Sequence, residues 1–335
     1  MRACYAASTE DPEQLPPPAA PVAFVQPQPE PERPKKSLDC PDWPINPKKA
    51  AENQKAAGAK TEDTLDLGNG VTLRLSLIPA GEYIMGSRFG ANDEFPQTQV
   101  RIEKPFWMGV TEITNRQYQT FDPKHDNGVI DQHHKDHTRP GYSVQDPEMP
   151  AIRISWDEAS AFCQWLATKT GRGFSLPSET QWEWACRAGA ASPFYFGEAD
   201  ADFSPFANLA DLSLKLLAVD GIDPQPIKNP SPFQDFLIKD TRFSDGEKIM
   251  TTVGKYQPNV WGLCDMLGNA AEWTRSAYRP YPYQEASNAD GREKKSVRGG
   301  SWFDRPKHAT ASSRQAYEPW QHVYNVGFRV ICPAE

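Results

Sequence analysis

Prolines crowd the first part of this chain and set the first limit on what it can fold into. They include Pro16-Pro17-Pro18, Pro21, Pro27, Pro29, Pro31 and Pro34, spaced by Ala, Gln and Glu. Because proline fixes its own φ and donates no backbone hydrogen bond, this segment favours an extended, polyproline-like chain. We therefore expect a disordered Pro-rich arm or linker over residues 1–62 and one folded domain over residues 63–335. The arm is interpreted as a spacer, with docking into a partner's aromatic groove as the alternative.

Charge and composition exclude several classes of protein. The formal net charge is −8, so binding driven by nucleic-acid phosphates is not expected. No apolar run approaches the roughly 18 residues that a membrane helix needs, and no complete signal peptide is visible at the start of the numbering. None of the six cysteines belongs to a Cys-x-x-Cys pair, so neither a zinc ribbon nor a thioredoxin-type site is expected.

Local patterns predict short strands and few helices. Alternating apolar residues predict strands at residues 71–78, 81–86 and 105–110, with a closing strand at residues 326–332. Capping boxes at Thr114, Ser155 and Ser178 each predict a helix start, and residues 48–60 are compatible with a short solvated helix. Residues 190–262 show little periodicity, and a loop of that length is usually functional or held by an ion. The expected fold class is α+β with little regular secondary structure.

A series of short motifs runs in order through residues 70–333. It comprises Ile78-Pro79-Ala80-Gly81-Glu82, Val110-Thr111-Glu112-Ile113-Thr114-Asn115, Leu176-Pro177-Ser178-Glu179, Gly262 to Trp273, Arg298-Gly299-Gly300-Ser301-Trp302 and Gly327-Phe328-Arg329-Val330. In this order the motifs resemble those of the formylglycine-generating enzyme superfamily, also called the sulfatase-modifying factor family. The resemblance implies one compact domain with a variant of the C-type-lectin fold.

The same resemblance identifies what this chain lacks. Family members that generate formylglycine carry two cysteines after the Gly-Gly-Ser motif, which bind copper as thiolates and oxidise a cysteine of a sulfatase. No cysteine lies between Trp302 and Arg329, and the equivalent region consists of Ser301, Trp302, Asp304 and Arg314. We therefore expect no copper, no formylglycine generation and no catalytic residue here. Whether the chain has another enzymatic activity stays open.

Two calcium sites are implied by the resemblance. The first consists of Asp265, Gly268, Ala270 and Glu272, and the second of Asn208, Leu209, Asp245 and Glu247. Both combine carboxylate or amide side chains with backbone carbonyls, the hard oxygen ligands that calcium prefers. The alternative is that these residues only cap turns in ion-free loops.

A disulfide between Cys163 and Cys332 is also implied by the resemblance, and buried free thiols are the alternative. Such a bridge would place the protein in an oxidising, extracytoplasmic compartment, periplasmic or secreted. A cytoplasmic location is the alternative.

Aromatic and histidine side chains near the end of the chain are the candidate ligand contacts. They are Trp302, His308, Tyr317, Trp320, His322 and Tyr324, which suit stacking on a sugar or peptide, or simple packing. The histidines at positions 133, 134 and 137 are interpreted as a solvated loop, with a transition-metal site as the alternative. Arg314 and Arg329 are expected to pair with acids such as Asp157 or Glu183.

Three functions remain after these observations. The first is a non-oxidase binding, assembly or accessory module on a calcium-braced scaffold, with a protein partner. The second is an enzyme of another branch of the family, working in metal-dependent oxidation or maturation. The third is a variable, lectin-type ligand binder. Fold likeness alone does not separate them.

Overall fold

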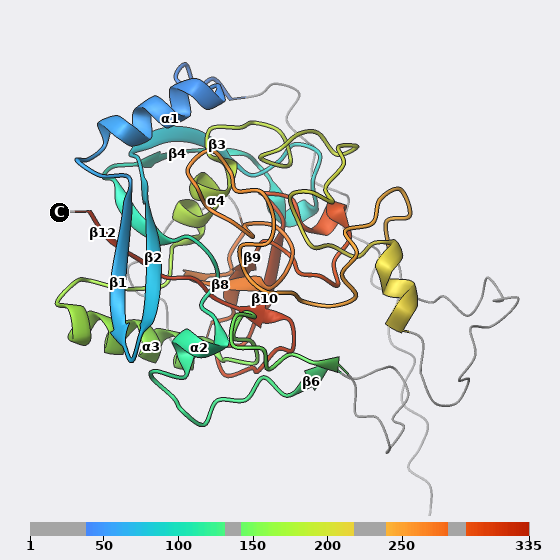
Figure 1. Cartoon of the computed structure of the whole chain (residues 1–335). Coiled ribbons are helices and arrows are strands. Elements are labelled where there is room, and N and C mark those ends of the chain that lie inside the picture. Colours follow the sequence, from blue (N-terminus) through green and yellow to red (C-terminus); the bar gives the residue numbers. More distant parts are fainter. Residues whose placement is uncertain (1–37, 131–141, 218–238, 281–292, 335) are drawn as a thin grey trace, which may run out of the picture. The chain divides into compact units, whose positions relative to one another are not determined.

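The computed structural model describes residues 38–130, 142–217, 239–280 and 293–334 (Figure 1). Most of the predicted Pro-rich arm and the histidine cluster at residues 133–137 lie outside these ranges. None of the helices within them combines the length and apolar character that a bilayer crossing requires.

Two four-stranded sheets form the framework. The first has the order β1-β2-β5-β12 and is antiparallel throughout, from Glu62–Gly68, Val71–Ile78, Phe106–Gly109 and Ile331–Pro333. The second has the order β10-β9-β8-β11, from Arg314–Tyr317, Lys295–Arg298, Ala271–Ala277 and Val326–Gly327. Only its β8–β11 pair is parallel. Two hairpins accompany the sheets, β3–β4 (Gly81–Met85, Thr98–Ile102) and β6–β7 (Val129–Ile130, Tyr142–Ser143).

The helices begin where their capping residues predict. They are α1 (Pro47–Ala56), α2 (Asn115–Tyr118), α3 (Trp156–Thr170) and α4 (Glu179–Arg187). The Thr114, Ser155 and Ser178 side chains accept from the backbone N–H groups of the third helical residues of α2, α3 and α4, at 3.2, 3.2 and 3.1 Å. Gly171 ends α3 with φ +72°, which a residue without a Cβ adopts at little cost. Short 3-10 turns lie at Asn92–Glu94, Leu212–Leu217 and Pro306–His308.

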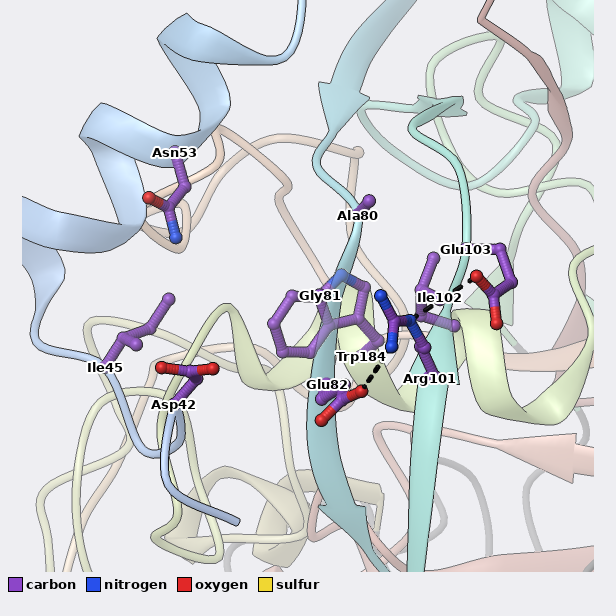
Figure 2. A pocket seen from close by; sticks show the side chains of 10 residues that line it. All are labelled: Asp42, Ile45, Asn53, Ala80, Gly81, Glu82, Arg101, Ile102, Glu103 and Trp184. Carbon is purple, nitrogen blue, oxygen red and sulfur yellow. Dashed lines mark hydrogen bonds and ion pairs between the residues drawn. The ribbon is translucent and has the colours of Figure 1, made fainter.

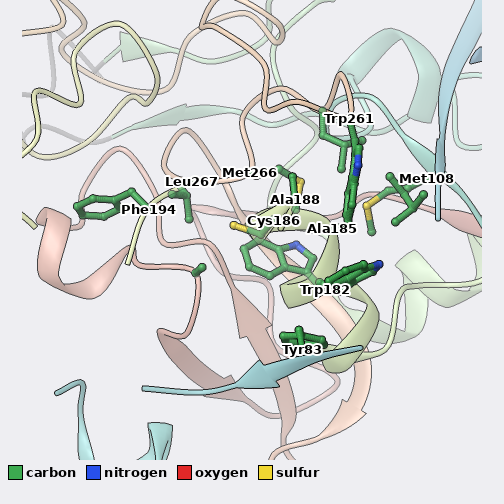
Figure 3. Packing of buried hydrophobic residues seen from close by; sticks show 14 of the residues in the cluster. Tyr83, Met108, Trp182, Ala185, Cys186, Ala188, Phe194, Trp261, Met266 and Leu267 are labelled. Carbon is green, nitrogen blue, oxygen red and sulfur yellow. The ribbon is translucent and has the colours of Figure 1, made fainter. Parts of the chain in front are cut away.

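Buried side chains form two large clusters and one small one. The first cluster gathers α4 with the loops around residues 194–209 and 261–267, and Figure 3 shows Trp182, Trp261, Cys186 and Met266 within it. The second packs α3 against β2, β8 and the closing segment. Loops therefore contribute much of the core, as expected for a fold with little regular structure.

The packed domain begins before residue 63, the boundary expected from composition. One face of helix α1 packs on the domain, because Ala50 is fully buried and its carbonyl accepts from Trp261 Nε1 at 3.1 Å, while the opposite face is solvated. The Gln54 amide donates to the Leu77 and Trp261 carbonyls at 2.9 and 3.1 Å. The apolar content of α1 is low, so these long-range contacts could not be read from its sequence.

The prediction of a single closing strand at residues 326–332 is wrong, because this segment forms two short strands. Val326–Gly327 joins the second sheet and Ile331–Pro333 joins the first, so the chain passes from one sheet to the other within a few residues. Phe328 and Arg329 lie at the crossing and are fully buried. This crossing brings both sheets to the region that carries the family motifs.

Candidate functional site

The region expected to correspond to the copper centre of formylglycine-generating relatives begins at a double-glycine turn after β9. Gly299 and Gly300 have φ values of +92° and +65°, which side chains with a Cβ rarely adopt. A Cβ on Gly300 would lie 2.7 Å from the Ala309 Cβ. The two glycines therefore allow Ser301 and the following residues to pack closely against the 3-10 turn at Pro306–His308.

Asp304 anchors a polar network at this place. Its Oδ2 accepts from the Ser301 backbone N–H at 2.9 Å and from Ser301 Oγ at 2.7 Å. The Asn325 amide donates to Ser301 Oγ at 2.8 Å, and the Gln315 amide donates to Asp304 Oδ1 at 3.3 Å. Every group in this network is an oxygen or amide, so the donor set does not fit a copper bis-thiolate.

The buried arginines have partners other than the acids expected for them. Arg314 makes a two-point pair with Glu179 at 2.5 and 2.9 Å, and Arg298 also contacts Glu179 at 2.9 Å. Arg329 pairs with Glu272, not with Asp157 or Glu183. Burial opposes ionisation of Glu179, but Arg298 and Arg314 outweigh it and lower the pKa of that carboxyl. This network stabilises the fold behind the site.

Four of the six candidate ligand contacts line one surface groove of about 400 Å³. Its lining residues, which we call the aromatic groove, are Tyr317, Trp320, Gln321, His322, Val323 and Tyr324. Trp320 is 66% exposed and Tyr324 39% exposed. Aromatic side chains this accessible are suited to contact a ligand or partner.

The other two candidates lie outside the groove lining. Trp302 is buried behind Tyr324, with their ring centroids 6.4 Å apart. His308 is exposed on its 3-10 turn. Partial burial of its ring, with the neighbouring Lys307 and Arg305, lowers the pKa of His308. Trp302 therefore supports the groove from within.

At the first predicted calcium site, Glu272 is already paired. Both oxygens of Glu272 are engaged, by Arg329 at 2.6 and 2.7 Å and by Trp182 Nε1 at 2.7 Å. Asp265 Oδ1 is buried with no hydrogen-bond partner, and the same holds for Glu112 Oε2. Burial and mutual repulsion raise the pKa of Glu112, and burial raises that of Asp265. Asp265 and Glu112 therefore each have one buried oxygen open to a cation, and Glu272 as a calcium ligand stays a prediction.

Glu112 was not among the expected ligands, although it lies in one of the family motifs. Its Oε1 accepts from the Asn269 amide at 3.1 Å, which ties it to the loop that carries Asp265. Across the described ranges, no three His, Cys, Asp or Glu side chains converge as a ready metal site. Calcium at this place stays a prediction.

The second predicted calcium site has an open carboxylate oxygen. Asp245 Oδ2 is buried without a hydrogen-bond partner, while its Oδ1 accepts from the Glu247 backbone N–H at 2.7 Å. The Asp211 carboxylate lies beside it and accepts from the Asp245 backbone N–H. Asn208 donates to the Ile249 carbonyl at 2.9 Å. Burial, together with the nearby Asp211, raises the pKa of Asp245 to about 7, although hydrogen bonds from the Glu247 backbone and the Tyr256 side chain act in the opposite direction.

The predicted disulfide is not formed in the described structure. Cys163 is a free buried thiol, and Cys332 lies in the same core cluster. Burial raises the pKa of the Cys163 thiol, so it is inert as a nucleophile in this state. The bridge stays a prediction.

A second hollow of about 380 Å³ lies between residues 42–53 and the β3–β4 hairpin (Figure 2). Arg101 reaches toward both Glu82 and Glu103, at 3.0 and 3.4 Å. The buried Trp184 contributes to its lining and donates to the Pro79 carbonyl at 2.8 Å. This hollow could not be predicted from the sequence, because its walls come from four separate segments between Asp42 and Trp184.

Comparison with known proteins agrees with the motif series. The model of the sulfatase-modifying factor enzyme 1-like domain matches residues 72–334. The inactive C-alpha-formylglycine-generating enzyme 2 of Bos taurus is 26% identical over 310 residues, covering 79% of this chain and 90% of that protein. The formylglycine-generating enzyme of Streptomyces coelicolor is 24% identical over 307 residues, covering 77% and 88%.

Two solved structures share the fold. PvdO from Pseudomonas aeruginosa has a TM-score of 0.61 at 20% identity and covers 82% of this chain and 99% of its own. Treponema denticola variable protein 1 has a TM-score of 0.59 at 18% identity and covers 82% and 100%. The expected fold class is confirmed. The chain therefore belongs to the family of sulfatase-modifying factor enzyme 1-like domains.

Proposed function

We propose that this protein is a non-oxidase member of its family that acts as a binding or assembly module, with the aromatic groove as its recognition surface. The observation that carries the proposal is the cysteine-free stretch from Trp302 to Arg329, where Asp304 holds Ser301 through two hydrogen bonds. Oxygen and amide groups bind Cu(I) weakly compared with thiolates. The similarity to proteins named as inactive formylglycine-generating enzymes supports the same reading.

Calcium and an oxidising compartment belong to this proposal. Buried carboxylate oxygens without partners at Asp265 and Asp245 are costly unless they are protonated or bind a cation. A calcium ion at either place would brace the loops that support the groove. A Cys163–Cys332 bridge would place the protein outside the cytoplasm, where it would meet a protein partner.

An activity assay tests the absence of oxidase chemistry. The purified protein is incubated with a Cys-x-Pro-x-Arg peptide, copper and oxygen, and the peptide mass is followed. We expect an unchanged cysteine, while the Streptomyces coelicolor enzyme serves as the positive control. Formylglycine in the sample with this protein would overturn the proposal.

A co-purification assay tests the recognition surface. Native complexes are compared for the wild type, for Trp320→Ala in the groove and for Phe89→Ala, which removes an exposed ring (88% exposed) outside the groove lining. We expect the partner to be lost from the first variant and retained by the second. Equal retention by both variants would refute the groove as the recognition surface.

A further inference from the structure

The aromatic groove presents apolar surface on a backbone that is tied in place. Trp320 is 66% exposed and Tyr324 is 39% exposed, and both line the groove. The Glu318 N–H donates to Gln321 Oε1 at 2.7 Å, and the Gln321 N–H donates to the Glu318 carbonyl at 3.0 Å. The Arg153 N–H donates to the Val323 carbonyl of the groove at 3.2 Å. A ligand therefore meets an ordered surface, which lowers the entropic cost of binding.

The groove also has hydrogen-bond donors that the protein does not use. Within the described ranges, Trp320 Nε1, the Gln321 amide nitrogen and the Tyr324 hydroxyl have no hydrogen-bond partner. The Gln321 carbonyl oxygen, by contrast, already accepts from the Glu318 backbone. Free donors of this kind suit a ligand that presents carbonyl oxygens.

The lining of the groove carries no Asp, Glu, Lys or Arg side chain. Its histidine, His322, lies with Nε2 3.0 Å from Glu158 Oε2 and so already has a partner of opposite charge. A charged ligand would lose hydration on entering this groove without meeting a free counter-charge. The lining therefore favours a neutral ligand.

The sequence itself contains a segment with the complementary chemistry. Residues 14–29, which lie outside the described structure, include six prolines and no Asp, Glu, Lys or Arg. Pro18-Ala19-Ala20-Pro21 is a Pro-x-x-Pro motif, and a polyproline helix with three residues per turn places its two prolines on the same face. Such a helix makes no internal hydrogen bonds, so its carbonyl oxygens stay free. Aromatic-lined grooves bind segments of this type.

We propose that the aromatic groove binds the Pro-rich segment at residues 14–29 of this protein, an inference that rests on the groove being a recognition surface. In this arrangement the two prolines of the Pro-x-x-Pro motif contact the exposed rings, and the free donors bind the carbonyl oxygens between them. An extended chain from Pro21 to residue 38 spans about 50 Å, comparable with the diameter of a domain of this size. The segment then competes with a partner protein for the same surface.

A fluorescein-labelled peptide of residues 14–29 tests this proposal by fluorescence anisotropy with the full chain. A tethered segment reaches an effective concentration on the order of 1 mM, so a dissociation constant of about 0.1 mM would fill about nine-tenths of the grooves. We therefore expect the full-length variant Pro18→Ser/Pro21→Ser to bind the added peptide about ten-fold more tightly than the wild type. The control variant Pro27→Ser/Pro29→Ser, which keeps the motif, should bind it as weakly as the wild type.

Further variants in the Pro18→Ser/Pro21→Ser background locate the binding site. Adding Trp320→Ala should weaken peptide binding at least about ten-fold, Trp320→Phe should weaken it less, and Phe89→Ala should leave it unchanged. The same peptide with serine in place of both motif prolines should not bind. Peptide binding that survives in Trp320→Ala, or equal binding by the wild type and Pro18→Ser/Pro21→Ser, would overturn the inference.

The outcomes separate this inference from the proposed function. If the peptide does not bind and the partner protein is still lost from Trp320→Ala, the groove remains the recognition surface and only its occupant is wrong. If Trp320→Ala loses the peptide but retains the partner protein, the inference stands and the proposed role of the groove in partner recognition fails.

Discussion

Replacing Arg329 with methionine tests the buried charge network most directly. The Arg329 guanidinium donates to both Glu272 oxygens at 2.6 and 2.7 Å, and to the Gly109 and Cys264 carbonyls at 3.1 and 3.0 Å. Glu272, Asp265 and Glu112 are all buried, and the last two act electrostatically on Arg329. Removing the arginine therefore leaves three neighbouring acids without their shared counter-charge.

The expected loss is about 3–5 kcal/mol of unfolding free energy, the usual cost of stranding one member of a buried ion pair. Urea unfolding followed by tryptophan fluorescence measures it. The control is Arg101→Met, because Arg101 is 65% exposed beside Glu82, and an exposed pair contributes about 0–1 kcal/mol. The variant Arg329→Met/Glu272→Gln should recover part of the loss, since it removes one stranded charge.

Two results would refute this reasoning. One is a loss for Arg329→Met that does not exceed the loss for Arg101→Met. The other is a double variant that is no more stable than Arg329→Met alone, because the cost would then come from lost packing and not from charge.

Three further predictions concern acid stability, a glycine and calcium. The pKa of Glu179 is lowered in the fold, so its stabilisation is present above the usual carboxyl pKa of about 4.3 and lost as pH falls through the lower folded value. Glu179→Gln should therefore be less stable at pH 7 and show a flatter acid limb in pH-dependent urea unfolding. Gly300→Ala should cost about 2–4 kcal/mol in the same assay, because of its positive φ and the contact with Ala309; wild-type stability would contradict the geometry. Chelating calcium should lower the melting temperature of the wild type and of Asp42→Asn, an exposed control, by more than that of Asp245→Asn; equal shifts would argue against an ion at Asp245.

Local signals in the sequence were reliable where a few neighbouring residues decide the outcome. Thr114, Ser155 and Ser178 begin helices because each hydroxyl satisfies an N–H three residues later, a contact within one turn. Residues 71–78 form the predicted strand, with alternating burial only over its first half and both faces buried from Leu75 to Ile78. The aromatic residues at 317, 320 and 324 were also identifiable, since they lie within one short segment.

Contacts between distant segments were not predictable in the same way. The sequence suggested Asp157 or Glu183 as partners for Arg314 and Arg329. The partners are instead Glu179 and Glu272, because the fold buries those carboxylates beside the two arginines. The same packing pairs Glu272 with Arg329 and ties Glu112 to the loop that carries Asp265. The packing of one face of α1 against Trp261 could not be predicted either, because Trp261 lies more than two hundred residues away in the sequence.

The sequence by itself determined the family, through motifs whose order and residue types are written along the chain, and it determined the absence of the thiol pair, because no cysteine lies between Trp302 and Arg329. Only the tertiary structure decided what those residues do instead. Pairing, burial and exposure depend on segments that meet through packing, so the Asp304 network, the Arg329–Glu272 pair and the aromatic groove appear only once the two sheets and their loops are assembled.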